Sequence, residues 1–343
     1  MNILNFNKFK KKNFILLSKI LFGISEHVRK IKYKKLYVIL IHIILKENVD
    51  ERTIINHKDS VKCLLKLNNN KIASGSLDKA IKIFNLLTGE CLFHLIGHTE
   101  TIISLLKLNK NLIASGIYDN SIKIWSSANG MCIKTLILKG HIKQISCLVK
   151  INDRQIASGS MDKLIKVWDI ISDICIKTFE MHTRYVTSLI RIKYKMIASG
   201  SDDETIRIWD LKNDICINTF KGHSNCINCI IKLDQVKIIS GSTDNTIKIW
   251  DLNTSNCLKT ITGQGSFARC MLKISQNTII IGSSNRNMYI LEFKDEYRDE
   301  ENDINFKVIE NIQDTAICLI KQNEKQIIFG SNNNSIKVRN ILS

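Results

Sequence analysis

The stretch GSDDETIRIWDL at residues 200–211 returns almost unchanged as GSTDNTIKIWDL at residues 241–252. A phrase that recurs at a fixed distance indicates a repeat architecture, in which every unit carries the residues that it needs to fold and to stack on its neighbours. The four tryptophans extend the pattern, because they lie at positions 125, 168, 209 and 250, at intervals of 43, 41 and 41 residues. The sequence therefore predicts consecutive units of similar length.

Histidine and aspartate follow the same period. A histidine precedes the aromatic residue of each of five units, at His57, His98, His141, His182 and His223. An aspartate lies six residues before that aromatic residue, at Asp78, Asp119, Asp162, Asp203 and Asp244. Two weaker copies keep the spacing with other residues, namely Gln264, Asn285 and Leu291, then Ile312, Asn333 and Arg339. The chain is therefore expected to hold seven units.

Each unit has the apolar pattern of β-strands. The segment TIRIWDL alternates apolar and polar residues and is rich in β-branched side chains, which suit a pleated surface. We expect four short strands per unit: one after the histidine, one ending in Ile-Ala-Ser-Gly, one carrying the tryptophan, and one beginning at a cysteine. The charged insertion at 294–306 is expected to be a solvated loop between units six and seven.

Two dipeptides occur in phase with the repeat. Gly-His occurs at 97–98, 140–141 and 222–223, and Trp-Asp occurs at 168–169, 209–210 and 250–251. With these marks the chain resembles the WD40-repeat β-propellers over roughly residues 50–343. The resemblance implies an all-β fold in which seven four-stranded blades surround a central channel. The expected domains are a basic, partly helical extension at 1–50 and a propeller at 51–343.

The two ends of the repeat region predict how such a ring would close. Unit seven ends directly after SIKVRNI at 335–341, so its fourth strand is missing. Residues 52–56 (RTIIN) precede His57 as INTFKG precedes His223, and they therefore have the character of a fourth strand without its first three. Pairing the two segments would complete the blade and remove two exposed strand edges.

His, Ser, Asp and Trp recur together, and the first three include the residue types of a serine-hydrolase triad. A constellation repeated at fixed spacing indicates architecture, because catalysis needs one site. The resemblance implies buried hydrogen-bond networks, and we predict no catalytic residue and no enzymatic activity. The predicted network residues are His98, Asp119, Trp125, His141, Asp162, Trp168, His182, Ser199, Asp203, Trp209, His223, Asp244 and Trp250.

Ten of the eleven cysteines are in phase with the repeat, which indicates small apolar strand residues rather than a redox or metal framework. Cys226 and Cys229 form a single C-x-x-C with no second pair of matching spacing, so no metal site is expected. No phosphate-binding glycine loop occurs, and no cofactor is expected. Many free thiols suit a reducing compartment, which favours a cytoplasmic location and leaves a nuclear one open.

The first 50 residues carry eleven Lys or Arg against three acids, within a chain of net charge +18. From Phe14 to Ile31 apolar residues recur with helical spacing, which is compatible with a helix that contacts a membrane, a targeting peptide, a helix packed on the propeller or an unordered extension. The sequence has no stretch of eighteen apolar residues without a charge, so it predicts no transmembrane helix. Related ubiquitin-ligase receptors carry an adaptor-binding box there that usually opens with Leu-Pro, but this chain has no proline.

In the resembled architecture the turns before the first and third strands of each blade open on one rim. Several of these positions in blades two to four are apolar or aromatic, which marks an interaction patch. The predicted partner-binding residues are Tyr118, Ile142, Gln144, Met161, Tyr185 and Asp202. Lys62 and Arg269 occupy a deeper position that phosphopeptide-reading relatives use, yet no base precedes any of the repeated aspartates, so phosphate reading is not favoured.

The sequence thus predicts a non-enzymatic scaffold that binds proteins or peptides on the propeller rim. The propeller itself is expected to be a monomer within a larger complex. Two alternatives stay open: a substrate receptor of a ubiquitin ligase, and an RNA-associated propeller, for which the pI of about 9.4 is the reason. Nucleic-acid binding is not favoured, because the absence of proline and the abundance of Lys, Asn and Ile indicate compositional bias.

Overall fold

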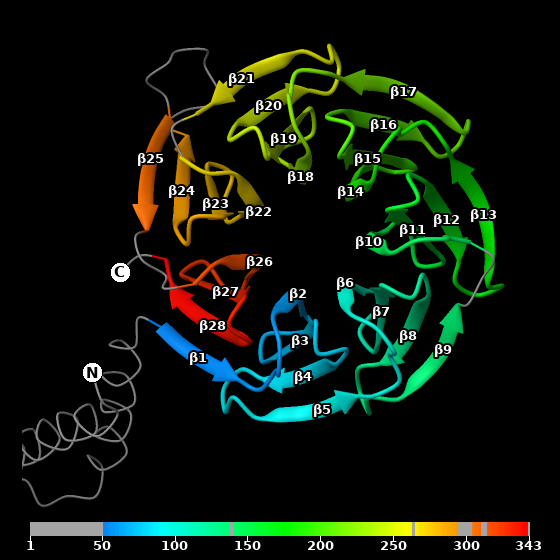
Figure 1. Cartoon of the computed structure of the whole chain (residues 1–343), viewed down its shortest axis with the longest axis vertical. Coiled ribbons are helices and arrows are strands. Elements are labelled where there is room, and N and C mark those ends of the chain that lie inside the picture. Colours follow the sequence, from blue (N-terminus) through cyan, green and yellow to red (C-terminus); the bar gives the residue numbers. More distant parts are fainter. Residues whose placement is uncertain (1–50, 137–139, 263–264, 294–303, 310–313, 342–343) are drawn as a thin grey trace, which may run out of the picture. The chain divides into compact units, whose positions relative to one another are not determined.

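The structure is a computed structural model that describes residues 51–136, 140–262, 265–293, 304–309 and 314–341. The chain divides into two units, Met1–Asp50 and Glu51–Ser343. The predicted basic helix therefore lies outside the described residues. The described part contains 28 strands and no helix, and Figure 1 shows them arranged as a ring of seven blades.

Every blade is a four-stranded antiparallel sheet. The strands of each blade are given from the innermost outward. Blade 1 is β2 (Val61–Lys66), β3 (Lys71–Ser76), β4 (Ile81–Asn85) and β5 (Cys91–Leu95), and blade 2 is β6 (Ile102–Lys107), β7 (Leu112–Ile117), β8 (Ile122–Ser126) and β9 (Cys132–Leu136). Blade 3 is β10 (Ile145–Lys150), β11 (Gln155–Ser160), β12 (Ile165–Asp169) and β13 (Ile174–Phe179). Blade 4 is β14 (Val186–Lys193), β15 (Met196–Ser201), β16 (Ile206–Asp210) and β17 (Ile215–Phe220). Blade 5 is β18 (Ile227–Lys232), β19 (Lys237–Ser242), β20 (Ile247–Asp251) and β21 (Cys257–Ile261).

Blade 6 includes the strand that follows residues 294–303, and blade 7 combines the first and last described strands. Blade 6 is β22 (Ala268–Lys273), β23 (Thr278–Ser283), β24 (Met288–Phe293) and β25 (Ile304–Ile309), and blade 7 is β26 (Ala316–Lys321), β27 (Gln326–Ser331), β28 (Ser335–Asn340) and β1 (Glu51–Ile55). The prediction of a loop over 294–306 is wrong at its end, because residues 304–306 belong to β25. That strand pairs with β24 and supplies the fourth strand that blade 6 would otherwise lack.

The predicted closure is confirmed. Strand β1 pairs antiparallel with β28, with Glu51 opposite Arg339 and Ile55 opposite Ser335. Figure 1 shows β1, in blue, beside β28, in red. The Arg52 guanidinium also donates hydrogen bonds to the carbonyl oxygens of Leu86 and Leu87 in blade 1, at 2.9 and 2.8 Å. The first and last described strands of the chain therefore complete one blade and fasten it to the next.

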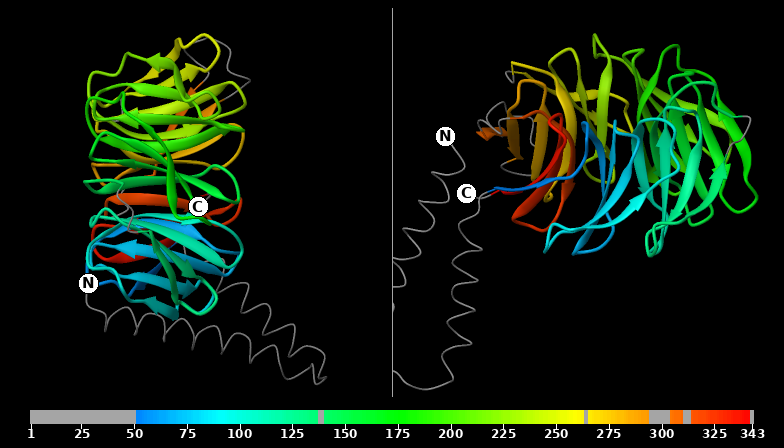
Figure 2. Two further views of the ribbon diagram at one scale, coloured as in Figure 1. Left: turned by 90° about the vertical axis from the view of Figure 1, so that its right-hand side faces the viewer. Right: turned by 60° about the horizontal axis from the view of Figure 1, so that its bottom comes forward.

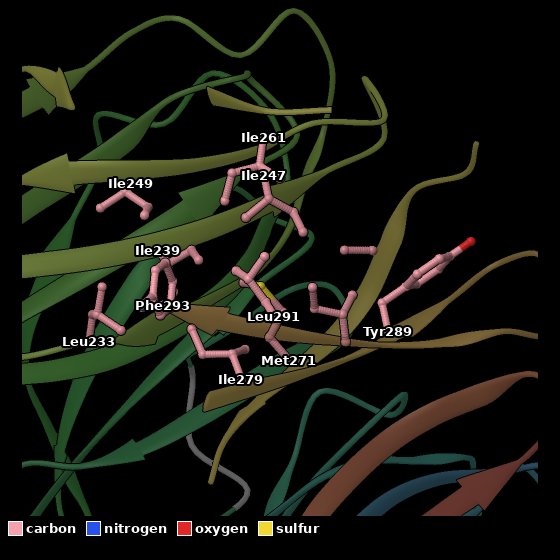
Figure 3. Close-up of a cluster of buried hydrophobic side chains, with 12 residues drawn as sticks. Leu233, Ile239, Ile247, Ile249, Ile261, Met271, Ile279, Tyr289, Leu291 and Phe293 are labelled. Carbon is pink, nitrogen blue, oxygen red and sulfur yellow. The ribbon is translucent and has the colours of Figure 1, made fainter. Parts of the chain in front are cut away.

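The hydrophobic core lies between neighbouring blades. One cluster packs side chains of blade 5, such as Ile239 and Ile247, against Met271 and Leu291 of blade 6 (Figure 3). Six similar clusters fill the other blade boundaries. Both faces of each sheet are thereby buried, as a closed ring of sheets requires.

The glycine of the repeated Ser-Gly-Ser is needed for this packing. A Cβ atom on Gly75 would lie 2.5 Å from the Ile102 side chain, and one on Gly200 would lie 2.8 Å from Ile227. Ile102 and Ile227 are the first residues of the next inner strands, and both are completely buried. The second strand of a blade can therefore approach the following blade because it has no side chain at this point.

Candidate interaction surface

The rim is built from two kinds of segment that meet at one end of the channel. The loop between consecutive blades carries the histidine, and the turn between the second and third strands carries the aspartate. Figure 2 shows the ring from two further sides. Backbone hydrogen bonds join each loop to its turn, such as Met161 N–H to the Gln144 carbonyl and Asp202 N–H to the Tyr185 carbonyl, both at 2.9 Å. Predicted rim residues from separate parts of the sequence are thus brought together.

Blade 4 shows the buried network beneath the rim. His182 Nδ1 lies 2.8 Å from Asp203 Oδ2, and His182 Nε2 lies 2.7 Å from Ser199 Oγ. The Trp209 indole N–H donates to the same Ser199 oxygen at 2.8 Å. With its proton on Nδ1, the imidazole donates a hydrogen bond to the Asp203 carboxylate, and its Nε2 accepts one from the Ser199 hydroxyl. All four groups are partnered, so the network fixes the loop on the sheet.

The aspartate is ionised because of these contacts. Burial alone would raise the pKa of Asp203, but hydrogen bonds from His182, Thr205 and the Thr183 amide hold it well below its usual range. Blades 1, 3 and 5 have the same His–Asp pair, with nitrogen–oxygen distances of 2.8, 2.8 and 2.7 Å. The predicted network of His141, Asp162, Trp168, His223, Asp244 and Trp250 is present in the same form.

Blade 2 departs from this pattern. His98 and Trp125 both contact Ser115 Oγ at 2.8 Å, yet Asp119 Oδ2 accepts a hydrogen bond from Thr99 instead of His98. His98 Nδ1 is buried without a hydrogen-bond partner. Burial and the nearby Lys123 charge lower the pKa of His98 to about 3, against the opposing effect of Asp119. The loop that leads to blade 2 therefore lacks the His–Asp hydrogen bond that fastens the loops to blades 1, 3, 4 and 5.

The predicted partner-binding residues differ in exposure. Tyr118 is 54% exposed, Ile142 is 78% exposed and Tyr185 is 40% exposed, so three large apolar groups face solvent on the rim of blades 2 to 4. Met161 is half-buried, whereas the Gln144 side chain is buried, in contrast to the exposure that its position suggested. Lys143 lies 6.0 Å from the Tyr185 ring centroid, which places a cation beside the aromatic face.

Sequence reasoning missed two residues of the same loops. Ile96 and Met181 are exposed, directly before the Gly-His and the His of blades 2 and 4. Their apolar character at the end of a fourth strand looks like core sequence, so no signal separated them from buried positions. Asp202 is half-buried and lies 3.8 Å from the Arg184 guanidinium.

Lys62 and Arg269 lie deeper, as second residues of the inner strands β2 and β22. Burial and then the Arg269 charge lower the pKa of Lys62, while Asp59 opposes them. The Arg269 guanidinium lies 5.3 Å from the Phe267 ring centroid. Corresponding residues elsewhere bond the next blade: the Thr187 hydroxyl donates to the Ile227 carbonyl of blade 5, besides the Gly200 carbonyl of its own blade, and Asn228 donates to the Ala268 carbonyl of blade 6 at 3.0 Å.

Other kinds of site are not seen in the described residues. They contain no group of three metal-ligating side chains and no helix able to span a membrane. All eleven cysteines are free, and burial raises the pKa of the Cys229 thiol to about 12. A pocket of about 160 Å³ between blades 3 and 4 is lined by apolar side chains, by Gln155 and by three lysines, Lys177, Lys195 and Lys212. It holds no carboxylate, serine or histidine that could act as a catalyst.

The fold and the rim define a seven-bladed β-propeller, and comparison with known proteins agrees. A profile of "WD domain, G-beta repeat" matches residues 49–85, 89–126, 130–169, 173–210 and 214–251. The chain belongs to the WD40-repeat family. No curated protein sequence matches it significantly.

Solved structures share the fold. The WD40 β-propeller domain of Doa1 is 23% identical with a TM-score of 0.72, over 84% of this chain and 94% of that domain. The structure of U3-55K is 18% identical with a TM-score of 0.76, over 86% of this chain and 99% of that one. At such identities the likeness concerns the fold alone. WD40 propellers are in general protein-interaction scaffolds.

Proposed function

We propose that this propeller is a non-enzymatic scaffold that holds a protein or peptide segment on the rim of blades 2 to 4. The observation that carries the proposal is the exposure of Tyr118, Ile142 and Tyr185 above a network that needs none of them. Large aromatic side chains are frequent energetic anchors of protein interfaces, and contiguous exposed apolar groups are uncommon on non-interacting surfaces.

The distribution of apolar groups around the rim supports this location. Ile96 and Met181 extend the exposed set within the same blades. Among the described residues, the exposed aromatic side chains at this end, Tyr118 and Tyr185, lie in blades 2 and 4, whereas blades 5 to 7 expose there one large apolar side chain, Ile55 at the end of β1. The fold repeats around the ring, so a feature restricted to some blades does not arise from the repeat itself.

The chemistry of the surface favours a segment with apolar anchors and acidic neighbours. Lys143 lies beside Tyr185, and Arg184 precedes it. Their cations would steer an acidic segment toward the apolar side chains. We place the protein in the cytoplasm, since eleven free thiols suit a reducing compartment.

Affinity purification with mass spectrometry tests the proposal. The double variant Tyr118→Ala/Tyr185→Ala should stay folded and lose its partner, because each anchor is worth roughly 2 kcal/mol or more at a hot spot. The matched control is Leu87→Ala/Met131→Ala, which removes two exposed apolar groups from the outer hairpins at the opposite end of blades 1 and 2. Unchanged recovery by the tyrosine variant, with an unchanged melting temperature, would contradict the rim site.

The identity of the recovered partners tests the alternatives. A cullin adaptor that is recovered only with residues 1–50 present would indicate a ubiquitin-ligase receptor. RNA that is recovered with a steep dependence on salt would indicate an RNA-associated propeller. Both experiments compare the full chain with the same two double variants, and the adaptor experiment also includes a chain that lacks residues 1–50.

A further inference from the structure

A second feature lies at the other end of the channel. The sixth residue of every inner strand is a cation, and each of the seven pairs with an equivalent isoleucine in the second strand, from Lys66 opposite Ile72 to Lys321 opposite Ile327. The seven residues, named the basic ring here, are Lys66, Lys107, Lys150, Arg191, Lys232, Lys273 and Lys321. Because the inner strands share one direction, all seven lie at the end of the channel opposite the rim.

The blades hold these ammonium groups in a circle. Lys66 Nζ donates to the Gln322 carbonyl at 2.5 Å, Lys232 donates to Ile192 at 2.5 Å, and Lys321 donates to Ile274 at 2.6 Å. Lys107, Lys150 and Lys273 bond the equivalent carbonyls of Leu67, Leu108 and Leu233. In each case the acceptor belongs to the preceding blade. Figure 1 shows the inner strands from which they extend, around the centre of the ring.

Each lysine keeps donors for another group. An ammonium has three N–H donors, and the carbonyl of the preceding blade takes one of them. Lys150, Lys232 and Lys321 use a second one on Asp153, Gln235 and Glu324, which leaves each of them one donor. Arg191 is the exception, because its side chain is exposed and forms no hydrogen bond or ion pair with the described residues. It therefore supplies positive charge without a role in fastening blades together.

Few carboxylates neutralise this end of the channel. The basic ring and the seven turns that follow it contain twelve Lys or Arg against three acids, Asp153, Asp234 and Glu324. Asp153 and Glu324 lie 2.6 Å from Lys150 and Lys321. Both carboxylates are highly exposed, and such surface pairs contribute little.

Further acids lie toward the outer edge, where their own turns occupy them. Asp169 accepts from the Ile171 amide and also pairs with Arg154, one of the twelve cations, at 2.5 Å; Asp210 accepts from the Lys212 amide and Asp251 from the Asn253 amide. Neighbouring inner strands contact one another all around the ring, so every ring cation has further ring cations on the two adjacent strands. Like charges gathered at one end of a channel repel one another, and a multivalent anion would relieve the repulsion.

We propose that the basic ring binds a compact, soluble polyanion that carries several phosphate groups. Seven equivalent cations arranged around one axis suit a rounded molecule with charges on several sides. An extended chain would meet only part of the circle. Ammonium groups bind phosphate as point charges and need no fixed planar geometry. The proposal concerns the end of the channel opposite the rim and is independent of the protein partner.

Isothermal titration calorimetry with inositol hexakisphosphate tests this site on the full chain. We expect binding at physiological ionic strength and a melting temperature that rises with ligand concentration. Inorganic phosphate at the same concentration should bind far more weakly. Absence of both heat and thermal stabilisation with the inositol phosphate would overturn the proposal.

Two triple variants separate the ring from general charge. Arg191→Gln/Lys232→Gln/Lys273→Gln should weaken binding by about tenfold or more, whereas Lys110→Gln/Lys212→Gln/Lys325→Gln, with the same charge change on exposed residues of the same end, should stay within about twofold. Equal losses would show diffuse attraction and refute the site. The single variant Arg191→Gln should weaken binding with an unchanged melting temperature of the free protein, which excludes misfolding as the cause.

Vesicles that contain a polyphosphorylated phosphoinositide distinguish the source of the phosphate groups. Competition of the free inositol phosphate with such vesicles supports a soluble ligand. Binding to vesicles alone, with no binding of the free compound, would overturn it. Binding of a homopolymeric RNA in preference to the inositol phosphate would do the same.

Discussion

Ile54 of β1 lies opposite Ile336 of β28, and both side chains are buried. Their pairing joins the first and last described strands of the propeller. The two residues belong to the cluster that packs blade 7 against blade 1, together with Val61 and Phe84. Closure of the ring therefore depends on hydrophobic burial as well as on the strand ladder.

Replacing Ile54 should destabilise the propeller much more than replacing its neighbour. Ile54 is 6% exposed and Ile55 is 74% exposed. We expect Ile54→Ala to lower the free energy of unfolding by about 2–4 kcal/mol and Ile55→Ala to change it by less than about 0.5 kcal/mol. Urea denaturation of both variants measures the difference. Similar effects of the two would show that β1 does not pack as described.

Truncation tests the same closure on a larger scale. Deleting residues 1–46 keeps β1 and should leave the melting temperature close to that of the full chain. Deleting residues 1–57 removes β1 and exposes the edge of β28, so a large fall in melting temperature or aggregation is expected. Differential scanning calorimetry and light scattering compare the two. Equal stability would mean that β1 is dispensable.

The aspartates of blades 4 and 2 should differ in importance. Asp203 bonds His182, whereas Asp119 makes no bond to His98. We expect Asp203→Asn to lower the free energy of unfolding by about 1.5–3 kcal/mol, because a neutral amide replaces the charged acceptor of the buried His182. Asp119→Asn should lower the free energy of unfolding by roughly 1 kcal/mol less, because Asp119 makes no hydrogen bond to His98. Chemical denaturation of both variants decides, and a larger cost at Asp119 would contradict the geometry.

His98 should make stability depend on pH. Its pKa is lowered to about 3 in the folded protein, so the unfolded chain binds the proton more readily. The contribution of His98 to the free energy of unfolding is fully present above the ordinary histidine pKa near 6.5. It is lost as the pH falls toward the pKa of His98 in the folded protein. Within this range the free energy of unfolding should fall by up to about 1.4 kcal/mol for each pH unit.

Melting temperatures between pH 7 and pH 4 measure that slope. The His98→Gln variant should lose part of the decrease, because glutamine has no titrating group. The comparison variant is His94→Gln, which removes an exposed histidine of the outer strand β5. The pKa of His94 is also lowered, first by partial burial and then by the Lys82 charge, so this variant should lose a smaller part of the decrease. An unchanged slope in His98→Gln would show that His98 does not titrate on unfolding in this range.

The sequence by itself determined the architecture of the ring. The intervals between tryptophans, histidines and aspartates gave seven units, and the unmatched segment 52–56 predicted closure by β1. These features repeat because each blade has to bury the same two faces and fasten the same turns. Local periodicity is therefore sufficient to specify them.

Only the tertiary structure decided which side chains are available at the surface. Gln144 is buried although its position resembles that of the exposed Tyr185, and His98 lacks the aspartate that every sequence mark assigns to it. The lysines nine residues after the histidine position could have been noticed as a series, but their common place at one end of the channel follows from strand direction and blade order. Exposure and charge proximity depend on contacts between blades, which residue spacing within one blade does not specify.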